Sequence, residues 1–189
     1  MLWVTLTLFS SSCLRRLREE LKAEGGVISG ELFVDECQVE SDLELLLPAT
    51  YVTGSSERML LYRELDSLTL DKDVEDFRTR LIDRFGPIPS ETEELLRIVP
   101  LRRLAARLGA EKVFLKGGRM SLFFVSNPDS PYYQSQAFGK VIAYMMKYTR
   151  RCDLREQNTR RSMLVKDVKN VETAVSVLQE IVAMQVEEG

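Results

Sequence analysis

The sequence contains no histidine among its 189 residues. This absence excludes the Ser-His-Asp and Cys-His arrangements of hydrolases and the HExxH motif of zinc proteases. The phosphate-binding patterns GxxxxGK[ST] and GxGxxG are also missing, so the chain has no recognisable phosphate cradle. We therefore expect no catalytic residue and no cofactor in this chain.

The sequence has few cysteines, and they lie far apart. The three cysteines, Cys13, Cys37 and Cys152, are odd in number and form no CxxC pattern, which argues against a disulfide framework and against a zinc site. This usage favours a reducing compartment, so we expect a cytoplasmic protein.

The sequence has no hydrophobic run of membrane-spanning length. Its apolar start, MLWVTLTLFSSSC, is far shorter than the roughly 20 residues that cross a bilayer, and it lacks the basic residues that open a signal peptide. We expect no membrane contact. Residues 1–26 are interpreted as a separate N-terminal helical segment, either an artificial start or the end of an upstream part.

Charge is balanced overall but unevenly distributed. The net charge of −3 combines acidic stretches at residues 35–44 and 91–94 with arginine-rich stretches at 97–107 and 150–161. Such asymmetry favours contacts with proteins over general nucleic-acid binding.

Three helical patterns lie between residues 47 and 109. The first follows a Gly54-Ser55-Ser56 cap region, the second ends at Gly86-Pro87, and the third ends at Gly109. We expect Asp71 or Asp73 to cap the second helix, and a capping box of Ser90 with Glu93 to open the third. Pro100 predicts a split or kink in the third helix.

The second half predicts strands and two covering helices. Apolar runs at 112–116 and 119–125 flank Gly117-Gly118, a hairpin turn signal. A helix, a second hairpin at 152–156 and 161–165, and a last helix capped by Asn170 follow. With short strands expected at 32–34 and 43–47, the sequence predicts an α+β fold. Its helical N-terminal half precedes a ββαββα antiparallel-sheet layer with helices on one face.

The acidic stretch offers a hypothetical metal site. Its carboxylates lack the glycine-punctuated spacing of a calcium loop. We therefore interpret this stretch as a solvated acidic edge and expect no metal. Its members are Asp35, Glu36, Glu40, Asp42 and Glu44.

Aromatic and arginine residues gather between residues 132 and 161. Arginines that hold phosphates and tyrosines that stack on bases would form a nucleic-acid surface. The alternative, which we favour, is that the tyrosines cover the sheet and the arginines form a solvated rim. The residues are Tyr132, Tyr133, Tyr144, Tyr148, Arg150, Arg151, Arg155, Arg160 and Arg161.

The tetrad Asp83-Arg84-Phe85-Gly86 is the most distinctive short motif. A lone carboxylate beside an arginine has its ionisation stabilised and is a poor general acid. Asp83 and Arg84 are expected to be exposed at the helix end, with Phe85 and Gly86 fixing the turn beneath them. These residues alone leave a structural role and a docking role equally open.

Taken together, PATYV, ERMLLYREL, LIDRFGPIP and LRRLAARLGAEKV resemble the C-terminal domain of the bacterial transcription-repair coupling factors, the Mfd proteins. The resemblance extends over roughly residues 27–185, so we assign residues 27–189 to such a domain. It implies a parent protein that is an ATP-binding, helicase-like DNA translocase, which removes stalled RNA polymerase from DNA and recruits nucleotide excision repair through UvrA.

The resemblance also implies a regulatory role for this domain. In the family it packs against a UvrB-like N-terminal module of the same protein, masks the UvrA-binding surface of that module and restrains activity. The matching contact position is Asp83, and Arg80 stands where relatives can carry an acid. We expect Asp83 and Arg84, with Arg80 and Glu75, to dock on that module. The alternative is a small stand-alone DNA-binding module that uses Arg160 and Arg161 of the second hairpin.

Overall fold

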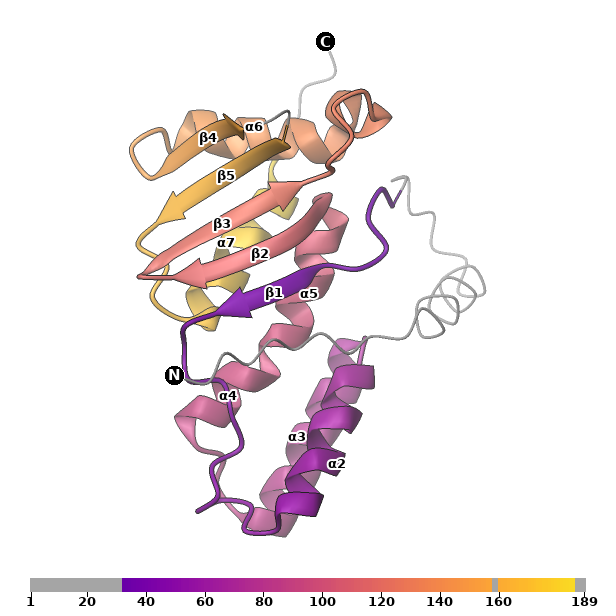
Figure 1. Ribbon diagram of the computed structural model, residues 1–189, viewed down its shortest axis with the longest axis vertical. Coiled ribbons are helices and arrows are strands. Elements are labelled where there is room, and N and C mark those ends of the chain that lie inside the picture. Colours follow the sequence, from indigo (N-terminus) through magenta and orange to yellow (C-terminus); the bar gives the residue numbers. More distant parts are fainter. Residues whose placement is uncertain (1–31, 158–159, 186–189) are drawn as a thin grey trace.

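The computed structural model describes residues 32–157 and 160–185. These residues form a five-stranded sheet with covering helices, and a helical lobe made by the helices of residues 55–96 (Figure 1). Residues 1–26, the predicted N-terminal segment, lie outside the described residues, as do residues 158 and 159. The elements are β1 (Gln38–Ser41), α2 (Ser55–Ser67), α3 (Asp71–Phe85), α4 (Ser90–Leu96), α5 (Ile98–Arg107), β2 (Ala110–Lys116), β3 (Arg119–Phe124), η1 (Pro131–Gln134), α6 (Gln136–Lys147), β4 (Cys152–Gln157), β5 (Arg160–Lys166) and α7 (Val171–Ala183). The predicted α+β class and the ββαββα order are confirmed.

The sheet has the strand order β1-β2-β3-β5-β4, with the two predicted hairpins as antiparallel pairs. Gly117 and Gly118 join β2 to β3 with φ values of 58° and 69°. Two successive positive φ values give the tight turn whose twist matches the strands, which is why glycine occupies both positions.

Strand β1 corrects the prediction for the acidic region. Neither 32–34 nor 43–47 forms a strand; the strand is Gln38–Ser41, which lies parallel to β2. Val34 and Leu47 of these runs are buried without joining the sheet, whereas Leu32 and Leu46 are exposed. Parallel neighbours need a long crossover, and here residues 42–109, including the whole helical lobe, supply it.

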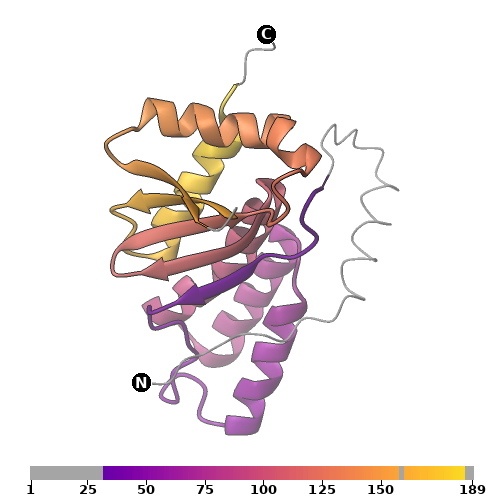
Figure 2. The same cartoon turned by 45° about the horizontal axis from the view of Figure 1, so that its top comes forward.

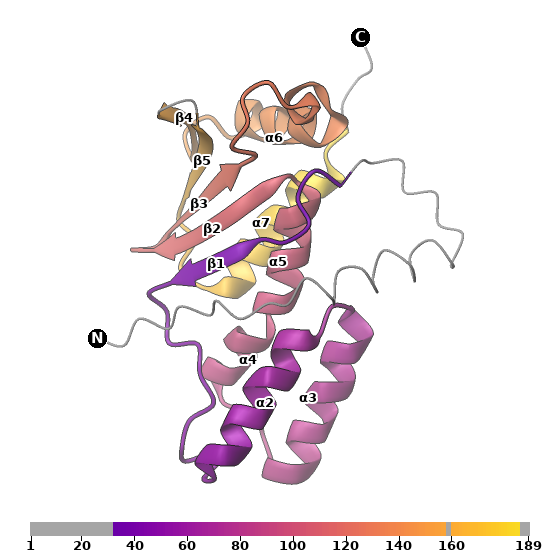
Figure 3. The same ribbon diagram turned by 45° about the vertical axis from the view of Figure 1, so that its right-hand side comes forward.

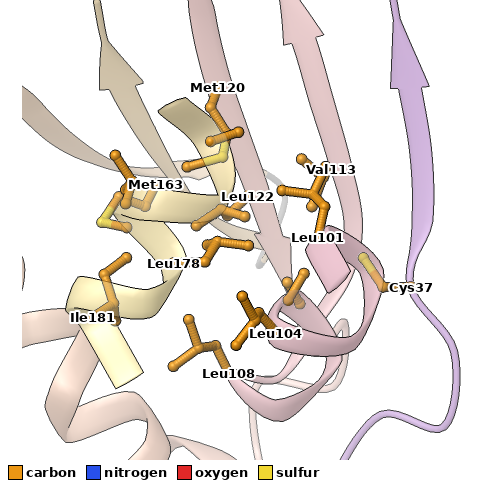
Figure 4. Packing of buried hydrophobic residues seen from close by; sticks show 14 of the residues in the cluster. Cys37, Leu101, Leu104, Leu108, Val113, Met120, Leu122, Met163, Leu178 and Ile181 are labelled. Atoms are coloured by element: carbon orange, nitrogen blue, oxygen red, sulfur yellow. The ribbon is translucent and has the colours of Figure 1, made fainter. Parts of the chain in front are cut away.

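The main hydrophobic core lies on one face of the sheet. Figures 1 and 3 show α5 and α7 side by side behind the strands. In Figure 4 Leu101, Leu104 and Leu108 approach strand residues Val113 and Leu122, which are both fully buried. Cys37 is also buried there, and desolvation raises the pKa of its thiol to about 12, so this cysteine is an inert packing residue.

The helical lobe has a smaller core of its own. Leu65 of α2, Phe77 and Leu81 of α3, and Leu95 of α4 form it together with Val99 of α5. Figures 1 and 2 show the α2–α3 pair and α6 at opposite ends of the molecule. The lobe therefore projects α3 away from the sheet.

The predicted split in the third helix is confirmed, but it lies at Arg97, upstream of Pro100. Pro100 has no N–H to donate to the carbonyl four residues earlier, so the break falls before it and the proline is accommodated in the first turn of α5. The predicted capping box is wrong: the helix begins after Pro89, and Glu93 binds Arg78 instead. Helix α3 likewise begins after Leu70, without a side-chain cap.

A mostly buried ion pair joins the helical lobe to α5. Asp66 of α2 lies 3.6 Å from Arg102, with side-chain exposures of 14% and 17%. Burial raises the pKa of the Asp66 carboxyl, and the arginine partly offsets this effect. Burying either charge alone would carry a large desolvation penalty, and the attraction between the two side chains offsets part of it.

Replacing Asp66 with alanine leaves the Arg102 charge buried without this partner. We expect a loss of about 2 kcal/mol in the free energy of unfolding, less than for a fully dry pair because both side chains keep some contact with water. Chemical denaturation of Asp66→Ala measures it, with the exposed Asp129→Ala as control. A loss no larger than that of the control would contradict this role.

Candidate docking site

The four residues predicted to dock lie together on α3 and are all exposed. The side chains of Glu75, Arg80 and Arg84 are 68%, 59% and 67% exposed, and Asp83 is exposed between the two arginines. The predicted exposure of Asp83 and Arg84 is confirmed. Whether these residues bind a partner stays a prediction.

The two arginines of this set face α2. Arg80 pairs with Glu64 and Arg84 pairs with Glu57, so two rungs connect the antiparallel helices. Each guanidinium also lies over a neighbouring ring, Arg80 over Phe77 and Arg84 over Phe85. Exposed pairs of this kind contribute little individually, but they orient both arginines toward α2.

The acids of α3 point elsewhere. Glu75 reaches Arg78 at 3.6 Å, while Arg78 forms its short contact, 2.6 Å, with Glu93 of α4. Asp83 and Asp76, which lie two turns apart on α3, make no ion pair within the described residues. We call Glu75, Asp76 and Asp83 the α3 acidic face.

A tyrosine from the PATYV motif fixes the end of α3. The Tyr51 hydroxyl lies 3.1 Å from the carbonyl oxygen of Leu81 and 3.0 Å from that of Gly86, so it donates to helix-end carbonyls. Its ring packs 5.7 Å from Phe85, measured between centroids. Burial raises the pKa of Tyr51, which keeps the phenol a donor. Gly86 ends the helix with φ 86°.

The ERMLLYREL motif anchors the same loop from α2. The Leu47 amide donates to the Tyr62 hydroxyl at 2.7 Å, and Arg58 Nη1 donates to the Val52 carbonyl at 2.6 Å. The PATYV, ERMLLYREL and LIDRFGPIP motifs thus contact one another. Their hydrogen bonds hold the loop before α2 against the end of α3, which carries Asp83.

Sequence reasoning missed the glutamates that hold the arginines. Glu57 and Glu64 are seven residues apart on α2, and Arg80 and Arg84 are four apart on α3. Since residues three, four or seven apart share a helix face, these spacings were a usable signal once the helices were taken as an antiparallel pair.

The acidic stretch is not assembled as a metal site. Within residues 32–157 and 160–185, no cluster of three or more potential ligands could hold a metal ion. Glu40 pairs with Lys112 at 2.5 Å, and the Asp42 carboxylate accepts from the Gly117 amide at 3.0 Å. Among the same residues no helix has both the length and the apolar character needed to span a bilayer.

The predicted aromatic and arginine patch is divided between buried tyrosines and a rim of arginines, some of which pair with acids. Tyr132 and Tyr144 are fully buried. Arg160 pairs with Glu111 at 3.3 Å, and Arg161 pairs with Glu156 at 3.6 Å while covering the Tyr133 ring. The tyrosine rings of this set are thus engaged within the fold, as the favoured interpretation expects.

The sequence profile of the TRCF domain matches residues 41–135, which are half of the chain. The chain belongs to this family. The matched TRCF domain residues contain the whole helical lobe, the first hairpin and the α3 acidic face.

Curated relatives of this TRCF domain are transcription-repair-coupling factors. The factor from Rickettsia bellii is 29% identical over 116 residues, and the match covers 61% of this chain but only 10% of the relative. The factor from Staphylococcus haemolyticus is 25% identical over 140 residues, covering 71% of this chain and 12% of the relative. The chain thus spans about a tenth of the length of these proteins.

A solved structure has the same fold. The crystal structure of the C-terminal domain of a transcription-repair coupling factor superposes with a TM-score of 0.62 at 18% identity. The match covers 78% of this chain and 92% of the other. The expected resemblance to a C-terminal domain of this family is confirmed.

Tyr51→Phe tests how the end of α3 is held. Removing the hydroxyl leaves partly buried carbonyls of Leu81 and Gly86 without this donor, so we expect stability to fall by about 1–2 kcal/mol. The matched control is Tyr144→Phe, because the buried Tyr144 hydroxyl has no hydrogen-bond partner among the described residues, so its loss should not destabilise the protein. Urea denaturation of both variants measures the difference; equal stability would argue against the Tyr51 contact.

Proposed function

We propose that this TRCF domain is the C-terminal regulatory domain of a longer ATP-dependent DNA translocase that couples stalled transcription to nucleotide excision repair. In this proposal it docks on the UvrB-like N-terminal module of the same protein and masks the UvrA-binding surface there. The domain itself has no catalytic role. It influences UvrA, RNA polymerase and DNA only through the parent protein in the cytoplasm.

The family assignment supports this proposal at the level of the whole protein. The relatives carry the name transcription-repair-coupling factor and are about ten times as long as the match. The absence of histidine and of nucleotide-binding motifs agrees with motor functions placed outside this chain.

The α3 acidic face is the observation that supports a docking role most strongly. Arg80 and Arg84 are paired with α2, whereas the Asp83 carboxylate makes no ion pair within the described residues. Tyr51 and Gly86 fix the helix end beside it. A carboxylate in a fixed position suits recognition of a basic side chain on a partner domain.

The strength of such a contact suits regulation. Exposed charge pairs contribute at most about 1 kcal/mol each and weaken with salt. A few of them hold two tethered domains together and still allow release when polymerase or UvrA favours another arrangement. Because Arg80 pairs with Glu64 and Glu75 contacts Arg78, Asp83 is the main acid of the proposed contact.

Asp83→Lys in the full-length parent tests the proposal. Charge reversal repels the basic partner surface, opens the masked face and should increase UvrA binding several-fold in a pull-down or titration. Asp129→Lys, an equal charge change at an exposed loop residue of the sheet half, should leave UvrA binding unchanged. Equal UvrA binding by wild type and Asp83→Lys would refute the docking role.

A further inference from the structure

Strand β4 forms the edge of the sheet that lies farthest from the helical lobe. Among the described residues its only strand neighbour is β5, because the strand order is β1-β2-β3-β5-β4. Figures 1 and 3 show β4 as the outermost strand, at the opposite end of the molecule from α2 and α3. Residues 153–157 of this strand are all exposed. The edge is therefore a second contact surface, separate from the α3 acidic face.

The pairing with β5 decides which backbone groups of β4 point outward. Arg151 lies directly opposite Lys166, one step beyond the paired residues of the two strands, and the Lys166 amide donates to the Arg151 carbonyl at 2.9 Å. Hydrogen-bonded pairs alternate along an antiparallel ladder. The odd-numbered residues of β4 thus bond β5, and the even-numbered ones direct their N–H and C=O groups away from it. The Cys152 amide agrees with this phase, because it donates to the Tyr148 carbonyl.

Edge strands usually carry a feature that stops another strand from adding to them. Proline, lysine and bulges are common examples. The sequence of β4, Cys-Asp-Leu-Arg-Glu-Gln, contains neither proline nor lysine, and its register with β5 is continuous. Among the described residues, no hydrogen bond reaches the outward backbone groups of Leu154 or Glu156. This edge is therefore open to a further strand.

The charges of β4 select a strand of the same sequence in one register. Asp153 and Arg155 flank Leu154 and share one face of the strand. When Leu154 lies opposite Leu154 of an antiparallel second copy, each Asp153 lies directly opposite an Arg155 of the other strand. A shift of two residues in either direction places Asp153 opposite Asp153, or Arg155 opposite Arg155, and like charges in such positions are destabilising.

The same register joins the outward backbone groups. Leu154 is one of the outward-bonding residues, so the two copies of it form a hydrogen-bonded pair at the centre of the new ladder. Its side chain lies opposite that of Met163 on the covered face and is 36% exposed, so the two leucines also meet there. The pairs of Asp153 with Arg155 fall at the flanking positions without hydrogen bonds, where side chains approach more closely.

The contact that these two charges already make does not prevent the pairing. Arg155 Nε lies 3.1 Å from Asp153 Oδ2, and the two side chains are 59% and 50% exposed. A carboxylate accepts several hydrogen bonds, and a guanidinium has five N–H donors. Each group therefore has the capacity for a further partner across the junction.

We propose that two copies of this chain pair through β4, antiparallel and two-fold symmetric about Leu154. Each copy contributes its five strands to one continuous sheet. The contact is isologous, so it closes at two copies. It is also small, so the dimer forms at high protein concentration and dissociates on dilution. The inference goes beyond the proposed function and does not depend on docking through Asp83.

Sedimentation equilibrium of the purified chain over a range of concentrations tests this inference. The measured mass should rise from 21.7 kDa at the lowest concentration toward twice that value at the highest. Leu154→Pro removes the outward N–H and leaves the ladder to β5 intact, because proline is tolerated where its nitrogen faces away from the sheet. This variant should stay monomeric throughout, with a far-UV spectrum like that of wild type.

Charge exchange tests the register. Asp153→Arg and Arg155→Asp each place like charges across the junction, so either variant alone should dimerise about tenfold more weakly than wild type. The double variant Asp153→Arg, Arg155→Asp restores the opposite charges and should regain wild-type dimerisation. An equal mixture of the two single variants should form mixed dimers for the same reason. The matched control is Asp129→Arg at an exposed loop residue, which should dimerise like wild type.

Four results would overturn the inference. They are a monomer at every concentration, undiminished dimerisation of Leu154→Pro, no recovery in the double variant, and growth beyond two copies, which indicates an open contact rather than a symmetric one. Asp83→Lys should dimerise like wild type, so failure here is distinguishable from failure of the docking proposal.

Discussion

Helix α5 is the element on which both halves of the protein depend. Its residues Leu101 and Leu104 belong to the core beneath the sheet, whereas Val99 belongs to the core of the helical lobe. Arg102, between these positions, forms the mostly buried pair with Asp66 of α2. One helix thus fixes the lobe relative to the sheet, and the split at Arg97, imposed by Pro100, sets where that helix begins.

The interior and the exterior of the lobe use different interactions. Inside, packing of Phe77 and Leu81 and the Tyr51 hydrogen bonds fix α3. Outside, exposed pairs such as Glu64 with Arg80 are individually weak. A rigid support beneath weakly interacting charges is what reversible docking needs, because the contact can be released without loss of the fold.

Local signals predicted much of the fold. The glycine pair at 117–118, the stop at Gly86-Pro87 and the Asn170 cap each depend on residues close in sequence, and each is confirmed. Strand β1 was missed because its partner β2 is some seventy residues away and its own sequence, Gln-Val-Glu-Ser, is polar and short. The apolar runs on either side of β1 bury single residues such as Val34 and Leu47 without strand pairing, and hydrophobicity alone does not distinguish such packing from a strand.

The candidate site was predicted in part. The turn chemistry of 83–86 and the family motifs located Asp83 on an exposed helix end, as observed. The pairing of Arg80 and Arg84 with α2 and the hydrogen bonds of Tyr51 come from contacts between segments distant in sequence. Such contacts depend on how helices and strands pair, which periodicity does not specify.

We propose that the end of α3 faces another domain of the same protein until UvrA binds. A photo-crosslinking amino acid at position 83 of the full-length parent measures this directly. We predict crosslinks to the UvrB-like N-terminal module in the resting protein and their loss when UvrA is added. Crosslinks confined to other regions, or unchanged by UvrA, would contradict the account.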